Sequence, residues 1–203
     1  MEQTLDAAHG LFAERGYAAV TMDEIAAAVG VTKPLLYAYF GNKERLYIAC
    51  MERAGDALTE TVAEAVARAS SPAEALGAGV HAFFFFLDSD RAAWAVLFDE
   101  TLPNQGEVAE RVAEYRARIL RFVAGSIAAQ LPEAVREDAG TEIEALSTAV
   151  LGAAEALARW WLRNEALSAV QAAELLIATV EPGLRARSAS PTPNPSRKGT
   201  APE

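Results

Sequence analysis

The sequence has one cysteine and two histidines, which excludes several classes of protein. Cys50 alone can form neither an internal disulfide nor a multi-cysteine metal site. A glycine-rich phosphate loop and the HExxH and GxSxG motifs are also missing. We therefore expect no catalytic residues, no metal and no cofactor, and the chain is not expected to be an enzyme. Cys50 is expected to be a small buried residue, with a redox sensor as the alternative.

Long hydrophobic runs are missing as well. Apolar residues make up 52% of the 203 residues, but no run of them approaches the roughly 20 that a membrane span needs. The longest candidate, around Phe83 to Leu87, is bounded by His81 and Asp88. The start, Met1-Glu2-Gln3, lacks the basic and then apolar layout of a signal peptide. These features predict a soluble, cytoplasmic protein with no membrane partner.

Positive charge is scarce. The net charge is −10, whereas a protein that coats DNA without specificity would be basic. Most of the excess lies in residues 51–183, which carry ten basic against twenty-one acidic side chains. Near the N-terminus, Lys33, Lys43 and Arg45 outnumber Glu44. Any contact with DNA is therefore expected to be small, local and defined by geometry.

The residues that are present predict an all-α fold. Apolar residues recur at spacings of three and four, alanine is abundant, and no segment alternates as a strand would. Glycine, proline and capping residues divide the chain into about nine helices. We expect them over about 3–15, from Thr21 to about 28, from Thr32 to 40, from Asn42 to about 69, from Pro72 onward, on either side of Pro103-Asn104, over 141–164, and from Ser168 to Pro182.

The same punctuation predicts three parts. Residues 1–47 are expected to form an N-terminal helical domain, the head, and residues 48–183 a larger helical domain, the body. The tail, 184–203, is rich in Ser, Pro, Arg and Gly and is expected to be disordered. The alternative for the tail is extra DNA contact through basic residues: Arg185, Arg187, Arg197 and Lys198.

The strongest signal is the segment 21–43, TMDEIAAAVGVTKPLLYAYFGNK. Thr21 and Glu24 form a capping-box pattern, and Gly30 offers the positive φ that a tight turn between two helices favours. A small core is expected from Ile25, Val29, Val31, Leu36 and Phe40. The outward residues of the second helix are then Thr32, Lys33, Pro34, Leu35, Tyr37 and Tyr39. Such a surface suits a major groove better than open water.

Here the chain resembles the TetR family of regulators. The resemblance rests on Gly30-Val31-Thr32 and on Leu36-Tyr37-x-Tyr39-Phe40-x-Asn42-Lys43, and it covers about residues 4–50 closely. It implies base reading by Lys33, Pro34, Leu35, Tyr37 and Tyr39, and phosphate contacts from Thr21, Thr32, Tyr37 and Lys43. Ala38 stands where the family often has a larger side chain, so a base contact there is not expected. The alternative is ordinary helical packing in an unrelated α-protein, with the tyrosines half-buried.

One head makes few contacts, so two heads on a two-fold dimer are expected to read a palindromic operator in double-stranded DNA. The resemblance implies that the last two helices pair across the dimer as a four-helix bundle. The candidate residues are Ile143, Leu146, Val150, Leu157, Trp161, Leu176 and Ile177. The alternative is that both helices only complete the core of one protomer.

The middle of the chain is rich in aromatic residues. Four consecutive phenylalanines, 83–86, point around a whole helix, so not all of them can face one core. Some are expected to line a pocket for an apolar or aromatic effector, although ordinary core packing is the alternative for each. The candidate pocket residues are His81, Phe84, Phe85, Trp94, Phe98, Tyr115, Phe122 and Glu155.

Together with these features, the resemblance implies a homodimeric repressor released from its operator by a small-molecule effector. Two alternatives stay open at this stage. One is a DNA-binding regulator without a small-molecule effector, its cavity filled by its own side chains. The other is a helical enzyme with a vestigial head.

Overall fold

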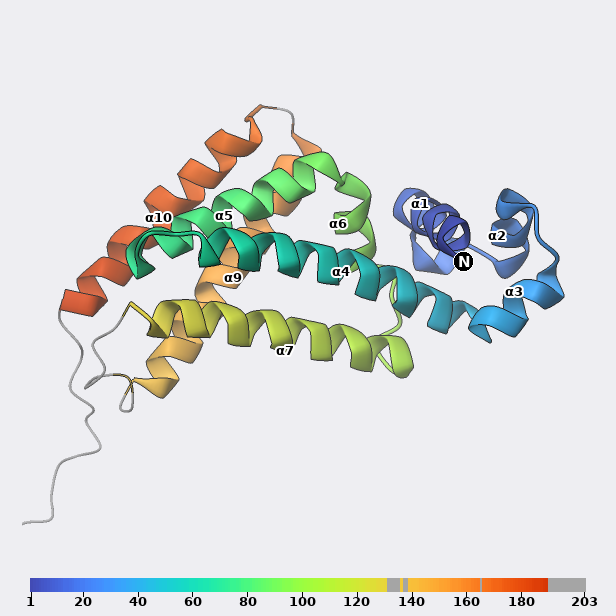
Figure 1. The fold of residues 1–203 in the computed structure, drawn as a ribbon, viewed down its shortest axis with the longest axis horizontal. Coiled ribbons are helices and arrows are strands. Elements are labelled where there is room, and N and C mark those ends of the chain that lie inside the picture. The colour runs from blue at the N-terminus through green and yellow to red at the C-terminus, as the bar shows by residue number, and fades with distance from the viewer. Residues whose placement is uncertain (131–135, 137–138, 165, 190–203) are drawn as a thin grey trace, which may run out of the picture.

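The computed structural model describes residues 1–130, 136, 139–164 and 166–189, and within them all regular structure is helical (Figure 1). The predicted all-α fold is confirmed. The helices are α1 (Glu2–Ala19), α2 (Met22–Val29), α3 (Lys33–Phe40), α4 (Lys43–Ala67), α5 (Pro72–Ser89), α6 (Arg91–Leu97), α7 (Glu107–Ala128), α9 (Gly140–Arg163) and α10 (Ala169–Ala189). None of these helices has both the length and the apolar character needed to span a bilayer.

Side-chain caps explain where several helices begin. The Asn42 side chain accepts a hydrogen bond from the amide of Arg45 at 2.8 Å, and Ser71 and Ser168 cap α5 and α10 in the same way. Each cap satisfies an amide that has no partner within its helix. Between α2 and α3, Gly30 takes φ 74° and ψ 27°, the left-handed conformation that the turn requires. All of these caps follow the sequence prediction.

The helices form a small head and a larger body joined by α4. Figure 1 shows α1, α2 and α3 at one end of the molecule, with α4 running from them along the body between α5 and α7. Helix α10 packs along α5, and α9 packs against α7 and α10. One buried cluster, which includes Phe12, Tyr47 and Val96, runs from the head into the body without a break. The predicted boundary at residue 47 therefore lies inside α4 and inside a continuous core.

The end of α10 differs from the prediction. The helix does not stop at Pro182 but continues to Ala189. Proline removes one backbone hydrogen bond from a helix, yet Leu184 beyond it is only 5% exposed and belongs to the body's second core cluster. Burial of this later turn compensates for the lost bond. The predicted tail thus has its first residues in a helix, and the rest of it, 190–203, lies outside the described residues.

Candidate nucleic-acid interface and ligand pocket

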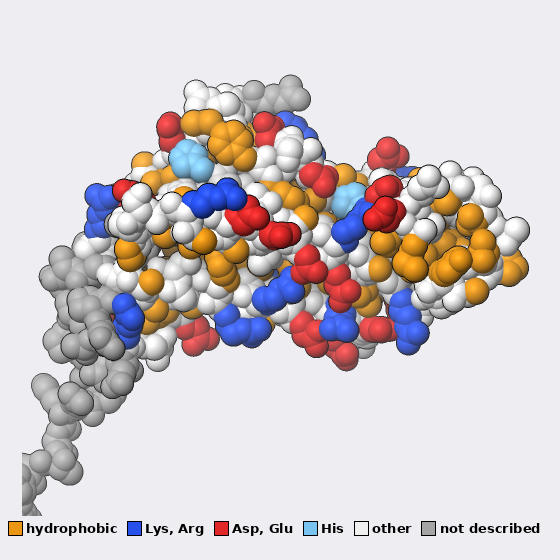
Figure 2. Space-filling model, viewed as in Figure 1, with side chains coloured by type: hydrophobic (Ala, Val, Ile, Leu, Met, Phe, Trp, Pro, Cys, Tyr) orange, Lys and Arg blue, Asp and Glu red, His pale blue; other side chains and the backbone are white. Residues whose placement is uncertain are grey.

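Helix α3 presents the surface that the sequence predicted. All six outward candidates are exposed, and the large ones remain so despite their apolar character: Leu35 is 43%, Tyr37 41% and Tyr39 63% exposed. Leu36, on the opposite side, is 1% exposed and fixes the orientation of the helix. Figure 2 shows hydrophobic side chains gathered at the α2 and α3 end, with few charged ones among them. The alternative of half-buried packing does not describe Tyr37 and Tyr39.

Lys33 is the cation of this face. Its Nζ lies 2.8 Å from Asp23 Oδ1 on α2 and 5.9 Å from the centre of the Tyr37 ring. Both charged side chains are more than half exposed, so water screens their attraction and the pair is weak. Lys33 is therefore available to exchange Asp23 for another anion at little cost.

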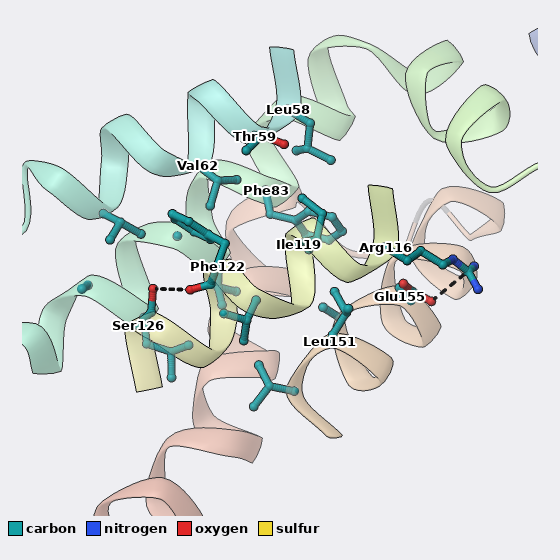
Figure 3. Close-up of a pocket in the computed structure, with 18 of the residues that line it drawn as sticks. Leu58, Thr59, Val62, Phe83, Arg116, Ile119, Phe122, Ser126, Leu151 and Glu155 are labelled. Atoms are coloured by element: carbon teal, nitrogen blue, oxygen red, sulfur yellow. Dashed lines mark hydrogen bonds and ion pairs between the residues drawn. The ribbon is translucent and has the colours of Figure 1, made fainter. Parts of the chain in front are cut away.

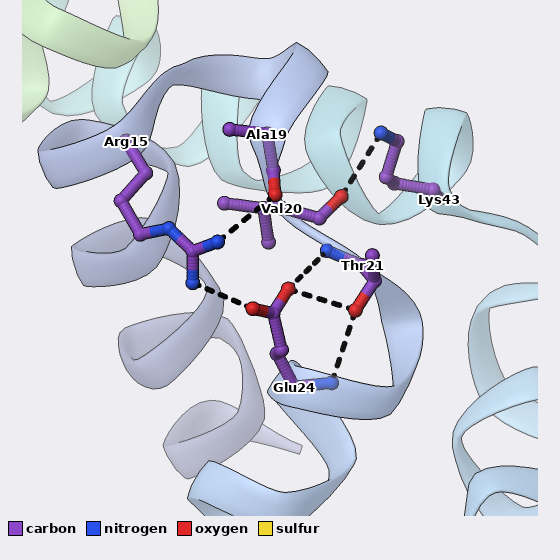
Figure 4. Close-up of polar contacts among 6 residues, drawn as sticks. All are labelled: Arg15, Ala19, Val20, Thr21, Glu24 and Lys43. Atoms are coloured by element: carbon purple, nitrogen blue, oxygen red, sulfur yellow. Dashed lines mark hydrogen bonds and ion pairs between the residues drawn. The ribbon is translucent and has the colours of Figure 1, made fainter.

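Thr21 and Glu24 form the predicted capping box at the start of α2 (Figure 4). The Glu24 carboxylate accepts from the Thr21 amide and hydroxyl, at 2.9 and 2.8 Å, and from Arg15 Nη1 at 2.7 Å. These bonds lower the pKa of Glu24 to about 2, the Arg15 bond being the largest cause. Arg15 also donates to the Ala19 carbonyl, so this network ties the end of α1 to the start of α2.

The Lys43 side chain binds backbone carbonyls within the head. Its Nζ donates to the Val20 carbonyl at 3.0 Å (Figure 4). It also donates to the Tyr17 carbonyl at 2.9 Å and lies 4.2 Å from the centre of the Tyr17 ring. Two of its three donors are thereby used inside the head. A phosphate contact from Lys43 stays a prediction, with at most one free donor to make it. Arg45, one turn into α4 and well exposed, is a nearby cation that the sequence analysis did not select.

A clasp joins the end of α1 to the segment after α6. We define the clasp as residues 16–18 with Asp99 and Thr101. The Tyr17 amide donates to Asp99 Oδ2 at 2.6 Å, and the Ala18 amide donates to Thr101 Oγ1 at 3.2 Å. These amides are free because Gly16, at φ 74° and ψ 162°, interrupts the helix. The Tyr47 hydroxyl adds a buried bond to the Val96 carbonyl. The head is thus held to α6 by directional bonds as well as by packing.

The body contains a pocket between α4, α5, α7 and α9 (Figure 3). It encloses about 960 Å³ of empty space, part of which is open to solvent. Its lining is mainly aliphatic and aromatic: Leu58, Thr59, Val62, Val66, Ala75, Leu76, Gly79, Val80, Phe83, Phe98, Tyr115, Arg116, Ile119, Phe122, Val123, Ser126, Val150, Leu151, Ala154 and Glu155. Such a cavity binds a molecule with a large apolar part.

Half of the predicted pocket residues line this space: Phe98, Tyr115, Phe122 and Glu155. The others do not, and the prediction is corrected for them. Phe84 is fully buried against Trp161, whereas Phe85 is 52% exposed. Trp94 and His81 are absent from the lining; Trp94 stacks on Phe98 from behind, with ring centres 3.9 Å apart. The sequence analysis missed the apolar residues of α4 and α9, whose helical spacing alone does not separate pocket from core.

Polar groups in the pocket are few and lie at its edges. Arg116 and Glu155 face each other with 3.9 Å between their nearest atoms, and Figure 3 shows them at the opposite side from Ser126. The Tyr115 hydroxyl donates to the Gly55 carbonyl at 3.2 Å, and burial raises the pKa of Tyr115. Tyr115 packs so closely that a Cβ at Gly55 would lie 2.4 Å from its ring. The pocket thus offers one charged pair and an otherwise apolar surface.

The predicted dimer residues divide into two groups. Ile143, Val150, Trp161 and Leu176 are buried inside the protomer, which leaves them little surface for a partner and favours the alternative of core packing for these four. Leu146, Leu157 and Ile177 are partly buried. The physical reason is that α9 has apolar residues on more than one side. Its exposed side carries a different stripe, Ala145, Ala149, Gly152, Ala156 and Trp160, and α10 exposes Val170 and Leu175.

Cys50 is fully buried, and burial raises the pKa of its thiol to about 12. A thiol with this pKa carries almost no thiolate at neutral pH, which disfavours the redox-sensor alternative. Among the described residues, no three side chains of His, Cys, Asp or Glu come together in a way that would hold a metal ion.

Comparison with known proteins agrees with this arrangement. Residues 5–50 match the family described as bacterial regulatory proteins, tetR family, and residues 72–181 match the tetracyclin repressor-like C-terminal domain. The HTH-type transcriptional activator FasR of Mycolicibacterium smegmatis is 30% identical over 166 residues, which cover 80% of this chain and 72% of FasR.

Two solved structures have the same fold. A TetR-like transcriptional regulator from Rhodococcus sp. RHA1 aligns with a TM-score of 0.72 and 30% identity, covering 94% of this chain and 96% of its own. FadR of Bacillus subtilis, solved in complex with stearoyl-CoA, aligns with a TM-score of 0.74 and 20% identity, covering 90% and 98% of the two chains.

Proposed function

The chain belongs to the TetR family of DNA-binding transcriptional regulators, and from this premise we propose that it is a cytoplasmic homodimeric repressor released from a palindromic operator by an effector with a long apolar part. The observation that carries the proposal is the exposed face of α3. Leu35, Tyr37 and Tyr39 are large, apolar or amphipathic, and exposed together on one short helix. A groove lined by base edges and thymine methyls gives such side chains partners that water does not.

The acidic composition of the chain supports a dimer. Each head neutralises few phosphates, so a single head gains little of the electrostatic affinity that most DNA-binding proteins use. Two heads about 34 Å apart, or a multiple of that, reach successive major grooves. We place the two-fold contact on the exposed stripe of α9. Its alanines and Gly152 allow two helices to approach closely, and Trp160, which is 46% exposed, supplies apolar surface that a dimer would bury.

Selection from randomised DNA duplexes tests both parts. The wild type is expected to enrich a sequence with two-fold symmetry, and sedimentation is expected to give the mass of a dimer. Trp160→Glu should yield monomers that bind the same DNA much more weakly. Phe85→Glu places the same charge on an equally exposed aromatic position of α5 and serves as the control. A wild-type monomer, or an enriched sequence without symmetry, contradicts the proposal.

The pocket supports an acyl chain as the apolar part of the effector. It is lined mainly by branched aliphatic and aromatic side chains, and the space between them is not filled by the protein's own groups. This favours an effector over the alternative of a regulator without one. FadR of Bacillus subtilis, which shares the fold, was solved with stearoyl-CoA. For this chain we propose the same class of ligand, a long acyl chain with a polar end.

Filling the pocket tests this ligand class. Ala154→Phe adds a ring to the lining of the pocket, whereas Ala57→Phe adds the same ring on an exposed face of α4. Stearoyl-CoA is expected to release operator DNA from the wild type and from Ala57→Phe, but not from Ala154→Phe. The direction of regulation is measured with a reporter gene behind the selected operator, where expression should rise when the regulator gene is deleted. Equal release from all three proteins contradicts the pocket assignment.

A further inference from the structure

A second cleft lies between the head and the body. Helix α1 contributes Phe12, Ala13 and Gly16, α6 and the segment after it contribute Trp94, Ala95, Phe98, Asp99 and Glu100, and α9 contributes Arg159, Leu162 and Arg163. The cleft encloses about 710 Å³ of empty space including its open side. It carries more charged groups than the apolar pocket: Asp99, Glu100, Arg159 and Arg163 line it, against Arg116 and Glu155 in the pocket. We call it the junction cleft.

The two cavities share one wall, the ring of Phe98. On the side of the junction cleft, Trp94 stacks on Phe98 with ring centres 3.9 Å apart. The guanidinium of Arg116, which lines the apolar pocket, lies 5.8 Å from the centre of the Phe98 ring. Phe98 therefore lies between a space lined mainly by apolar side chains and a space lined by four charged ones.

Two arginines converge on one carboxylate in the junction cleft. Arg159 Nη1 donates to Glu100 Oε1 at 2.7 Å, and Arg163 Nη2 lies 3.9 Å from the same oxygen. Arg159 and Arg163 are one turn apart on α9, so their side chains extend in the same direction. The other carboxylate, Asp99, is already bonded to the amides of Tyr17 and Thr101. Glu100 thus occupies the position that an anion would take between the two guanidinium groups.

Another anion can displace Glu100 from the two arginines at little cost. Glu100 is 65% exposed, and an exposed pair of one carboxylate with arginine contributes little because water competes for both. A phosphate group has more charge and more acceptor oxygens than a carboxylate, and arginine binds it through two parallel hydrogen bonds. An anionic group that reaches the cleft should therefore displace Glu100.

Building on the effector proposed above, we propose that the junction cleft is a binding site for an anionic group, a phosphate or carboxylate, held by Arg159 and Arg163 in place of Glu100. The effector's apolar chain occupies the pocket, and its anionic end reaches the cleft past the Phe98 ring, which turns aside when this ligand binds.

The position of Glu100 connects this site to DNA binding. Glu100 lies between Asp99 and Thr101, the two residues whose side chains hold the backbone amides of Tyr17 and Ala18 in the clasp. Displacing Glu100 from the arginines releases the segment that fixes the end of α1 from its contact with α9. The site is thus placed to bias the orientation of the head, which a ligand achieves only through different affinities for the two states.

The test compares four probes: stearoyl-CoA, stearic acid, octadecanol and inorganic pyrophosphate. The first three share an apolar chain, and all except octadecanol carry an anionic group. Affinities for each are measured by calorimetry with the wild type, Arg159→Gln/Arg163→Gln, Glu100→Gln and a control, Arg68→Gln. Arg68 also forms an exposed pair on a helix, with Glu64, far from the cleft in the sequence and absent from its lining. Melting temperature and operator affinity without ligand establish that each variant is folded.

We expect stearoyl-CoA to bind the wild type about tenfold or more tightly than octadecanol, and the double variant to lose this difference while keeping its affinity for octadecanol. Glu100→Gln should strengthen the binding of the anionic probes several-fold, because the competing carboxylate is gone, and Arg68→Gln should change nothing. Equal affinity of the wild type and the double variant for both anionic acyl probes overturns the site but leaves the apolar pocket standing, since octadecanol reports on that pocket alone.

The remaining outcomes separate the two proposals. If pyrophosphate binds only when both arginines are present and no acyl probe binds, the site stands with free phosphate as its ligand, and the acyl effector is wrong. If none of the four probes binds the wild type, both proposals are wrong.

Discussion

Replacing Gly16 with alanine should loosen the clasp between head and body. At φ 74° and ψ 162°, Gly16 has a conformation that is almost restricted to glycine. A Cβ there would lie 2.9 Å from Thr101 Oγ1, on the side chain that accepts the Ala18 amide. The substitution therefore strains the backbone and pushes Thr101 away from its hydrogen bond at the same time.

The expected cost follows from these two effects. Forcing a residue other than glycine into such a conformation costs about 1–3 kcal/mol of folding free energy. The hydrogen bond between Ala18 and Thr101 is worth about 0.5–1.5 kcal/mol more. Gly16→Ala should thus lower the free energy of unfolding by about 2–4 kcal/mol, which for a chain of this length lowers the melting temperature by roughly 5–15 °C.

Urea unfolding followed by circular dichroism measures this cost, and Gly10→Ala is the matched control. Gly10 lies within the same helix, and a Cβ there meets no atom within 4 Å, so alanine should stabilise the helix by about 0.5–1 kcal/mol. In a Thr101→Ala background, Gly16→Ala should cost less, because the collision is gone and the backbone strain remains. A Gly16→Ala protein as stable as the Gly10→Ala protein refutes the clasp geometry.

Three further predictions concern titratable groups. His9 is 9% exposed, and burial lowers its pKa, so the unfolded chain takes up a proton more readily than the folded one as the pH falls through about 6.5. Between pH 7.5 and 5.5, the urea midpoint should therefore fall less for His9→Phe than for the wild type. An equal fall in both proteins would refute this. The Glu24 carboxylate, with its pKa lowered to about 2, stabilises the folded head above about pH 4.5 and loses this effect towards pH 2. The difference in melting temperature between the wild type and Glu24→Gln should therefore shrink as the pH falls from 5 to 3. Cys50 should resist a thiol reagent in the folded protein and react in guanidinium chloride, and operator binding should survive mild peroxide; rapid labelling of the folded protein would contradict its burial.

The head could be predicted from the sequence because its signals are local. A capping box needs only Thr21 and Glu24 at the right spacing, and Gly30 marks a turn whose backbone few other residues accept. With Leu36 as the buried anchor of α3, the period of the helix then determines that Tyr37 and Tyr39 are exposed.

The environment of Lys43 was not predictable in this way. Its partners are the carbonyls of Tyr17 and Val20, which are more than twenty residues away in the sequence. These carbonyls reach the ammonium group only because the chain bends at Gly16. A motif places the lysine at a helix start, but only the tertiary arrangement decides whether its donors point to solvent or to the backbone.

The body was predicted less completely because its helices are apolar on several sides. The four phenylalanines of the run 83–86 lie in different environments. Phe83 lines the pocket, Phe84 is in the core, Phe85 is exposed and Phe86 packs against the core. On α9, Val150 and Trp161 were expected to face a partner, whereas they are buried in the protomer's own interior. Composition alone does not distinguish these sides; the positions of α5, α7 and α10 do.

The most direct test of the account is the affinity of the selected operator for wild type, Tyr37→Ala and Phe85→Ala, measured by fluorescence anisotropy at one salt concentration. The two substitutions each remove an exposed aromatic ring, one from α3 and one from the body. The account predicts that Tyr37→Ala binds about tenfold or more weakly, because base contacts are worth about 1–3 kcal/mol each, and that Phe85→Ala binds like the wild type. Equal affinity of all three proteins, with each folded and dimeric, would contradict the claim that α3 reads DNA.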